Sequence, residues 1–316
     1  MKALAAGAIG AASLCVFAGS AFAWGNDGHE IIGHIAYDRL TPAVRARVDA
    51  MLAADSDTLT RPDFASRTSW AETYRNDGDK KLHYDQTRLW FFTDVELSAP
   101  GPERGLDDAC GHFPQLPPGT PASEGPANDC LTSKVIQFTD ELAAPNTPPA
   151  ERLKALKYVM NLVGDVHMPF HTSDNRDDHA NCLQVLTAPG AEMKQLHHYW
   201  DDSAVDNLIA ADRAQHPGDT NLAKVARQLS SEIKPGEAAK WESGDAKQWT
   251  LETFKIAQTV GYNLPRHPVC TPGMKWADYP PFVIPADYQA RTLQTTRVEL
   301  QQAGVRLAWL LNKALQ

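Results

Sequence analysis

The sequence predicts one mostly α-helical domain with a few short strands. Apolar residues recur with a helical period over much of the chain, and strand-like segments do not alternate with helices as they do in α/β proteins. No internal repeat of 20 to 50 residues is visible. We therefore expect a signal peptide over residues 1–23 and a single domain over residues 24–316.

The expected helices follow one another along the chain with few strand-like interruptions. They span residues 28–40, 42–54, 63–74, 130–143, 149–167, 220–233, 246–260 and 285–315. Thr41 and Pro42 suit the N-cap and the first turn of the second helix. Residues 87–97 are rich in β-branched and aromatic side chains and predict a strand, whereas residues 98–129 and 172–196 predict loops.

The first 23 residues have the features of a secretory signal. Lys2 precedes a stretch of small and apolar residues, and Ala21-Phe22-Ala23 forms a small-x-small cleavage site. Cleavage would make Trp24 the mature N-terminus of a secreted or periplasmic protein; a retained anchor is the alternative. No later apolar run reaches membrane-spanning length, so we expect a mature protein without a membrane segment.

Composition excludes several classes of protein. Among 316 residues, 43% are hydrophobic and 22% are charged, which excludes a disordered chain and a coiled coil. The net charge of −9 also excludes a protein that binds nucleic acid through overall positive charge. Nucleic acid would have to be bound through metal ions or a local pocket.

Four cysteines follow the signal segment, and an even number in an oxidising compartment predicts two disulfides. We expect Cys110–Cys130, because this bond would close a loop rich in proline and glycine. Cys182–Cys270 then follows by elimination.

Residues 164–171, GDVHMPFH, contain the first candidate metal ligands. Asp165 lies in an apolar stretch, and a buried carboxylate needs a cation, an arginine or a metal as partner. Pro169 should end the preceding helix, which leaves His171 on a backbone that can direct it elsewhere. The alternative is a helix end whose polar groups are satisfied locally.

Two further motifs offer ligands to the same kind of site. In LHHYWD, residues 196–201, His197 and Asp201 are four residues apart and would share one face of a helix; a surface hydrogen bond between them is the alternative. In WGNDGH, residues 24–29, the α-amine and carbonyl of Trp24 could chelate an ion close to His29. This third motif is weak without the other two.

The ordered motifs WGNDGH, SWAETYR, LWFFTD, GDVHMPFH and LHHYWD resemble the S1/P1 nuclease family. That family shares its fold with the zinc-dependent phospholipases C. The resemblance implies a secreted, mostly helical hydrolase with a cluster of three zinc ions. It would cleave single-stranded DNA or RNA and remove 3′-phosphates from nucleotides. We expect a monomer.

The resemblance assigns ligands to two zinc ions. One would be held by Trp24, His29 and Asp165. The other would be held by His171, His197 and Asp201. Imidazole nitrogens and carboxylate oxygens of this kind suit zinc.

The third zinc position departs from the family pattern. An aspartate is replaced by Glu72, and two histidines are replaced by Phe91 and Asn161. Because all three changes concern one ion, we expect this position to be altered or lost as a unit. His83 is either a replacement ligand or a surface histidine, and we favour the latter.

Other family positions suggest contacts with substrate. Phe92 and Asp94 match a pair that stacks on the nucleobase and accepts hydrogen bonds from its edge; a core aromatic beside a capping aspartate is the alternative. Arg75 matches a basic residue that meets phosphate charge, or it is an exposed arginine at a helix end. The family's Gly-Gly-Asn is replaced by the sequence His179-Ala180-Asn181.

These residues favour a secreted zinc phosphodiesterase with weakened activity. Asp165 would hold metal, Arg75 would meet the phosphate, and Glu72 would bind metal or orient the attacking water. One alternative is a metal-bound pseudonuclease that binds a nucleotide or a partner without turnover. Another is a phospholipase C-like phosphoesterase, which the pair Phe92–Asp94 disfavours.

Overall fold

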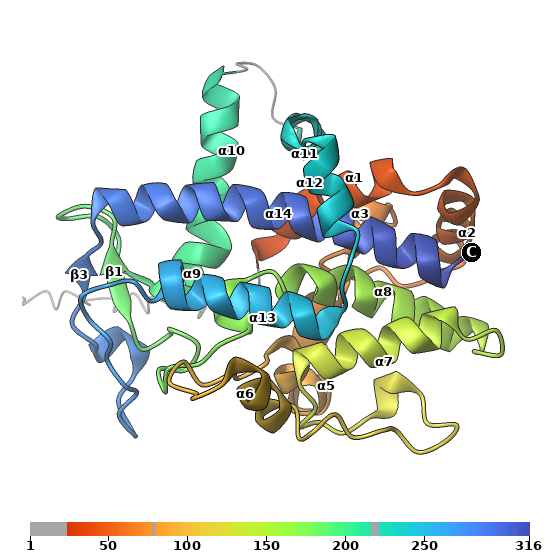
Figure 1. Cartoon of the computed structure of the whole chain (residues 1–316), viewed down its shortest axis with the longest axis horizontal. Helices are drawn as coiled ribbons and strands as arrows, with labels where there is room; N and C mark the ends of the chain where they lie inside the picture. Colours follow the sequence, from red (N-terminus) through yellow and green to blue (C-terminus); the bar gives the residue numbers. More distant parts are fainter. Residues whose placement is uncertain (1–23, 78–79, 216–220) are drawn as a thin grey trace, which may run out of the picture.

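A computed structural model describes residues 24–77, 80–215 and 221–316, and the expected signal peptide lies outside them. The described chain is mostly helical, as the sequence predicts (Figure 1). Its α-helices are α1 (Gly25–Arg39), α2 (Pro42–Ala53), α3 (Phe64–Arg67), α4 (Trp70–Asn76), α5 (Lys80–Thr87), α6 (Pro102–Ala109), α7 (Leu131–Ala143), α8 (Pro149–Asp165), α9 (Leu196–His198), α10 (Ala204–Gln215), α11 (Leu222–Glu232), α12 (Pro235–Trp241), α13 (Ala246–Ile256) and α14 (Ala286–Ala314).

Short helical turns join several of these helices. The 3₁₀ turns are η1 (Arg88–Phe91), η2 (Ala122–Glu124), η3 (Pro169–His171) and η6 (Trp276–Asp278). Two further turns, η4 (Tyr199–Ser203) and η5 (Ala257–Gly261), are π-helical. The turn η4 continues α9 directly into α10, so one helical run carries both His197 and Asp201.

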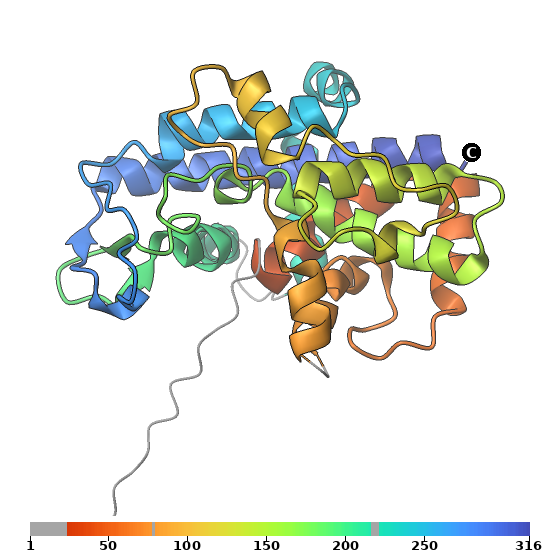
Figure 2. The ribbon, with the colours of Figure 1, turned by 90° about the horizontal axis from the view of Figure 1, so that it is seen from below.

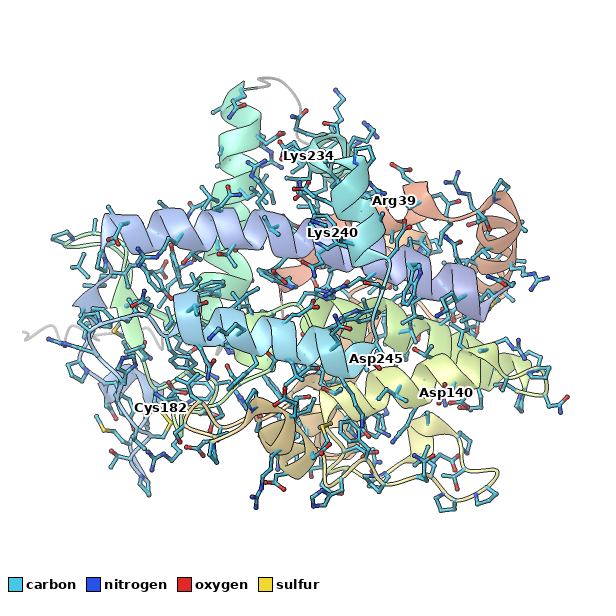
Figure 3. The ribbon with its side chains drawn as sticks, in the orientation of Figure 1. Arg39, Asp140, Cys182, Lys234, Lys240 and Asp245 are labelled. Carbon is cyan, nitrogen blue, oxygen red and sulfur yellow. A yellow bond between two sulfur atoms is a disulfide. The ribbon has the colours of Figure 1, made fainter. Side chains whose placement is uncertain are left out.

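The long helix α14 lies at the centre of the hydrophobic core. It packs against α1, α7, α8 and α10, and it runs along most of the molecule beside α13 (Figures 1 and 2). A capping side chain fixes where α2 begins, as the sequence predicts: the Thr41 side chain accepts a hydrogen bond from the Val44 N–H. Asp245 caps α13 in the same way (Figure 3).

The only sheet among the described residues is small. It has the strand order β2-β1-β3, with β1 (Gln184–Leu186) between β2 (Lys194–Gln195) and β3 (Phe282–Val283). Strand β1 is antiparallel to β2, with Gln184 opposite Gln195, and parallel to β3, with Val185 opposite Phe282. Strand β1 and helix α6 both lie in segments for which we expected loops alone.

The strand expected over residues 87–97 is wrong. Residues 88–91 form the 3₁₀ turn η1, and the extended part after it forms an isolated bridge between Glu96 and Asp174 and not a strand of a sheet. Trp90 and Phe91 are fully buried, and the Trp90 indole N–H donates to the Pro126 carbonyl, 2.8 Å away. The strand-like composition therefore reflects burial and not sheet formation.

Both expected disulfides are confirmed. Cys110 bonds to Cys130, and Cys182 bonds to Cys270. The first closes the loop that precedes α7, and the second joins the loop before β1 to the segment after η5. No described helix is both long enough and apolar enough to span a membrane.

Glu299 on α14 makes folding depend on pH. Burial raises the pKa of Glu299 to about 8 from an ordinary value of 4.5, although Arg306 opposes the shift. Between these values the folded protein holds a proton that the unfolded chain has lost, so the free energy of unfolding falls as the pH rises.

We expect Glu299→Gln to remove this slope. Relative to the variant, the wild type should lose about 2–4 kcal/mol of unfolding free energy between pH 5 and pH 9. Urea unfolding of both proteins at fixed zinc concentration measures the difference. Parallel pH profiles for the two proteins would contradict a buried, protonated Glu299.

Candidate metal centre

Four separate parts of the chain bring the candidate ligands together. The start of α1 carries Trp24 and His29, and the end of α8 carries Asp165. The turn η3 ends at His171, and the run from α9 into η4 carries the pair predicted from LHHYWD. All six candidate side chains are buried, with at most 1% of their surface exposed: Trp24, His29, Asp165, His171, His197 and Asp201.

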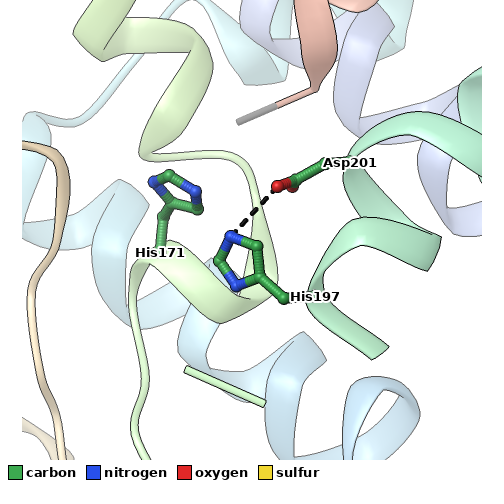
Figure 4. A group of neighbouring side chains, drawn as sticks. All are labelled: His171, His197 and Asp201. Atoms are coloured by element: carbon green, nitrogen blue, oxygen red, sulfur yellow. Dashed lines mark ion pairs between the residues drawn. The ribbon is translucent and has the colours of Figure 1, made fainter. Parts of the chain in front are cut away.

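His171, His197 and Asp201 converge on one point (Figure 4). One potential ligand atom from each lies within 4.8 Å of the others, close enough for a single ion to draw them together. The His197 Nε2 atom is 3.0 Å from an Asp201 carboxylate oxygen, yet the two do not form a hydrogen bond of good geometry. Two atoms that bind the same ion are expected to lie close together in this way without a hydrogen bond between them.

The backbone fixes the tautomer of both histidines. The Nδ1 atom of His171 lies 2.7 Å from the Phe91 carbonyl oxygen, and the Nδ1 atom of His197 lies 2.7 Å from the His179 carbonyl oxygen. Carbonyl oxygens only accept, so each Nδ1 carries the proton and each Nε2 presents a lone pair. Neither Nε2 has a hydrogen-bond partner, although both are buried.

Charge in this group also suits a cation. Burial lowers the pKa of His171 well below its ordinary value and lowers that of His197 to about 4. Both imidazoles are therefore neutral and able to bind metal. Burial raises the pKa of Asp201 well above its ordinary value, with Asp202 and Asp165 adding to the shift. A buried carboxylate that cannot easily carry its charge alone calls for a cation.

His29 and Asp165 form a second group beside the first. The His29 Nδ1 atom lies 3.1 Å from the Gly25 carbonyl oxygen, and its Nε2 atom lies 3.0 Å from an Asp165 oxygen. Burial disfavours the charged imidazole, but Asp165 and then Glu72 outweigh it and raise the pKa of His29 to about 9. The pair thus keeps a proton at neutral pH, and a metal ion bound between the two side chains would replace it.

Trp24 places its backbone beside the same carboxylates. Its indole N–H donates to the Gly164 carbonyl, 3.0 Å away, and its backbone N–H approaches Asp201 closely enough to favour the ionised carboxylate. Gly164 must be glycine here, because a Cβ atom at this position would lie 2.9 Å from the His29 Nε2 atom. The main chain of Trp24 therefore faces the site that the side chains form.

The residues at the family's third zinc position form a different arrangement. The Asn161 amide donates to the Thr68 carbonyl at 2.9 Å, and the guanidinium of Arg75 lies 4.3 Å from the centre of the Phe91 ring. Burial raises the pKa of Asp165 and lowers that of His171. The positive charge of Arg75 opposes the first shift and adds to the second, so it lies near both side chains. Glu72 is fully buried. Of these side chains only the Glu72 carboxylate is a usual zinc ligand.

His83 does not join this arrangement. Its ring stacks on Tyr74 with 4.1 Å between centroids, and its Nδ1 atom lies 3.2 Å from the Tyr74 carbonyl oxygen. In the described part of the chain, no contact links His83 with Asn161 or Asp165. The structure therefore supports the reading of His83 as a histidine outside the centre.

Phe92 and Asp94 lie at the edge of this group of candidate ligands, where they contact His179, a residue with no expected role. The Phe92 ring is stacked on His171 at 4.5 Å and on His179 at 4.1 Å between centroids. The His179 Nδ1 atom lies 3.4 Å from an Asp94 oxygen. The only signal of this contact in the sequence was the replacement of Gly-Gly by His179-Ala180.

Comparisons with known proteins agree with this geometry. Residues 24–316 match the family described as S1/P1 Nuclease. The chain is 25% identical to Endonuclease 2 of Arabidopsis thaliana over 300 residues, which covers 92% of this chain and 90% of that protein. It is 30% identical to Nuclease S1 of Aspergillus oryzae over 181 residues, 57% of this chain and 54% of that protein.

Another relative aligns over nearly the whole chain. Endonuclease 4 of Arabidopsis thaliana is 23% identical over 311 residues, which covers 93% of this chain and 89% of that protein. The motif order, the helical fold, the convergent ligands and the match over residues 24–316 lead to one conclusion: the chain belongs to the S1/P1 nuclease family.

Proposed function

We propose that the protein is a secreted phosphodiesterase that hydrolyses single-stranded nucleic acid or 3′-nucleotides with two zinc ions, and with weakened activity. The observation that carries this proposal is the convergence of His171, His197 and Asp201, whose two imidazole Nε2 atoms are buried and unpartnered. The family match supports hydrolysis of phosphodiester bonds. The two disulfides support an oxidising compartment.

Each residue of the centre has a role in this proposal. His171, His197 and Asp201 hold one ion, and the second is held by the amine and carbonyl of Trp24 with His29 and Asp165. When bound there, zinc would supply an activated water for in-line attack on phosphorus and would neutralise the charge of the phosphoryl oxygens.

The residues around the third position would act directly on the substrate. Arg75 contributes a permanent positive charge next to Asp165, where the family has its third ion, and it attracts a phosphoryl oxygen. The buried carboxylate of Glu72 orients the attacking water. A guanidinium cannot activate water as zinc does, so the reaction should be slower than with three ions.

Zinc content measured beside nuclease activity tests the proposal. We expect two tightly held zinc ions per chain and slow cleavage of a single-stranded oligonucleotide. The double variant Phe91→His, Asn161→His should bind one more zinc and cleave on the order of 100-fold faster, because a further metal ion supplies several kcal/mol of charge stabilisation.

Other outcomes would contradict the proposal in distinct ways. Two zinc ions with nucleotide binding but no turnover would identify a pseudonuclease. Hydrolysis of a phospholipid but not of nucleotides would identify a phospholipase C-like esterase. Three zinc ions in the unaltered protein would show that the third position is intact.

A further inference from the structure

The position expected for a nucleobase, at Phe92 and Asp94, already holds a side chain of this protein. His179 lies nearly parallel to the Phe92 ring, with 13° between the planes and 4.1 Å between centroids. His171 stacks on Phe92 as well, and the two imidazoles make no ring contact with each other in the described part of the chain. They therefore cover opposite faces of Phe92, and neither face is open to a base.

His179 also reaches the polar member of the pair. Its Nδ1 atom lies 3.4 Å from an Asp94 oxygen, and its side chain is only 13% exposed, whereas that of Asp94 is 50% exposed. The stacking on Phe92 is the contact expected of a nucleobase, and the ring lies close to Asp94 without a hydrogen bond to it. The imidazole ring thus fills the space that a stacked base would need.

A strained backbone holds His179 in this place. Asp178, His179 and Ala180 all have positive φ angles, 55°, 55° and 66°, which non-glycine residues adopt at a cost. Asp174 accepts a hydrogen bond from the His179 N–H, and Asp177 accepts one from the Ala180 N–H. The segment is further held by the disulfide between Cys182 and Cys270.

We propose that His179 determines the specificity of this centre: it occupies the nucleobase position at Phe92 and Asp94, so substrates bind through phosphate and sugar with little discrimination between bases. This inference rests on the proposed function of the centre, since it concerns how that centre selects its substrate. It assigns to His179 no part in the chemical step.

His179→Gly is the direct test, because glycine favours the left-handed backbone found at this position and removes only the ring. Arg176→Gly is the matched control. Arg176 has a φ of 59° in the same loop, but its side chain is exposed and pairs with Glu96. Both variants add one glycine to the loop, and only one of them opens the face of Phe92.

The first measurement is binding of adenosine, an uncharged nucleoside, to the zinc-loaded proteins by calorimetry. We expect His179→Gly to bind adenosine at least about tenfold more tightly than the wild type, since stacking on an aromatic ring contributes about 5- to 150-fold per base. Arg176→Gly should bind like the wild type. Equal affinity in all three proteins, or an equal gain in the control, would overturn the proposal.

The second measurement compares kcat/KM for a single-stranded oligonucleotide and for the same strand with abasic residues. The ratio should be near one for the wild type and rise at least about tenfold in His179→Gly. A wild type that already prefers the intact strand tenfold would overturn the proposal. If neither strand is cleaved by any variant, the proposed function fails, and adenosine binding still decides the role of His179.

Discussion

Replacing His197 by alanine should remove one zinc ion and most of the hydrolytic activity. His197 presents its Nε2 atom to the point that His171 and Asp201 also face, and two remaining ligands hold zinc poorly. We expect zinc content to fall by one ion per chain and kcat/KM to fall by about 1,000-fold or more. Metal analysis and cleavage of a single-stranded oligonucleotide measure both effects.

Stability gives a second readout of the same change. Zinc present at 100 to 1,000 times its dissociation constant should stabilise the wild type by about 3–4 kcal/mol, and the variant should lose this gain. The neighbouring His198→Ala is the matched control, because His198 is not among the convergent ligands. Unchanged zinc content in His197→Ala, or equal zinc loss in the control, would show that the ion is held elsewhere.

Extending the chain by residues before Trp24 should weaken the other metal position. The backbone of Trp24 lies beside Asp201, and its indole is buried and bonded to Gly164, so the residue cannot move aside. An added residue turns the amine into an amide, whose nitrogen lone pair is delocalised and binds zinc poorly. We expect zinc affinity at this position and activity to fall at least about 100-fold.

A cleavable extension keeps this test free of folding artefacts. The extended protein is assayed before and after treatment with a protease that cuts directly before Trp24. Recovery of both zinc and activity after cleavage is the expected result. An extended protein that already binds two zinc ions and is fully active would exclude the α-amine as a ligand.

Much of the fold followed from patterns that are local in sequence. Helical periodicity located α1, α2, α7, α8 and α14 to within a few residues, because an amphipathic face is set by residues one or two turns apart, and the Thr41 cap marked the start of α2. The strand predicted over residues 87–97 is wrong because its burial is not a local property of the sequence. Its aromatic residues are buried by contacts with distant parts of the chain, and composition alone does not reveal those contacts.

The candidate site also has features that local sequence predicts and features that depend on contacts between distant residues. The spacing within LHHYWD pairs His197 with Asp201, the family resemblance adds His171 to that pair, and the disulfides follow from loop composition and counting. The position of His179 could not be predicted from the sequence. It depends on three consecutive left-handed residues and on stacking across two loops, neither of which leaves a pattern in the sequence.

The π-helical turn η4 makes the protein sensitive to the deletion of a residue at this point of the chain. A π-turn contains one residue more than an α-turn, so α10 is rotated by about 100° from the path of a continuous α-helix. That rotation lets one helical run direct Asp201 to the metal centre and Val205, Leu208 and Ile209 into the core. Deleting one residue between Asp201 and Val205 would restore a regular helix but turn either the carboxylate or the apolar face away. The position of Asp201 among the candidate ligands therefore depends on the number of residues in this turn. A deletion here would disturb ligand placement or core packing more than most substitutions would.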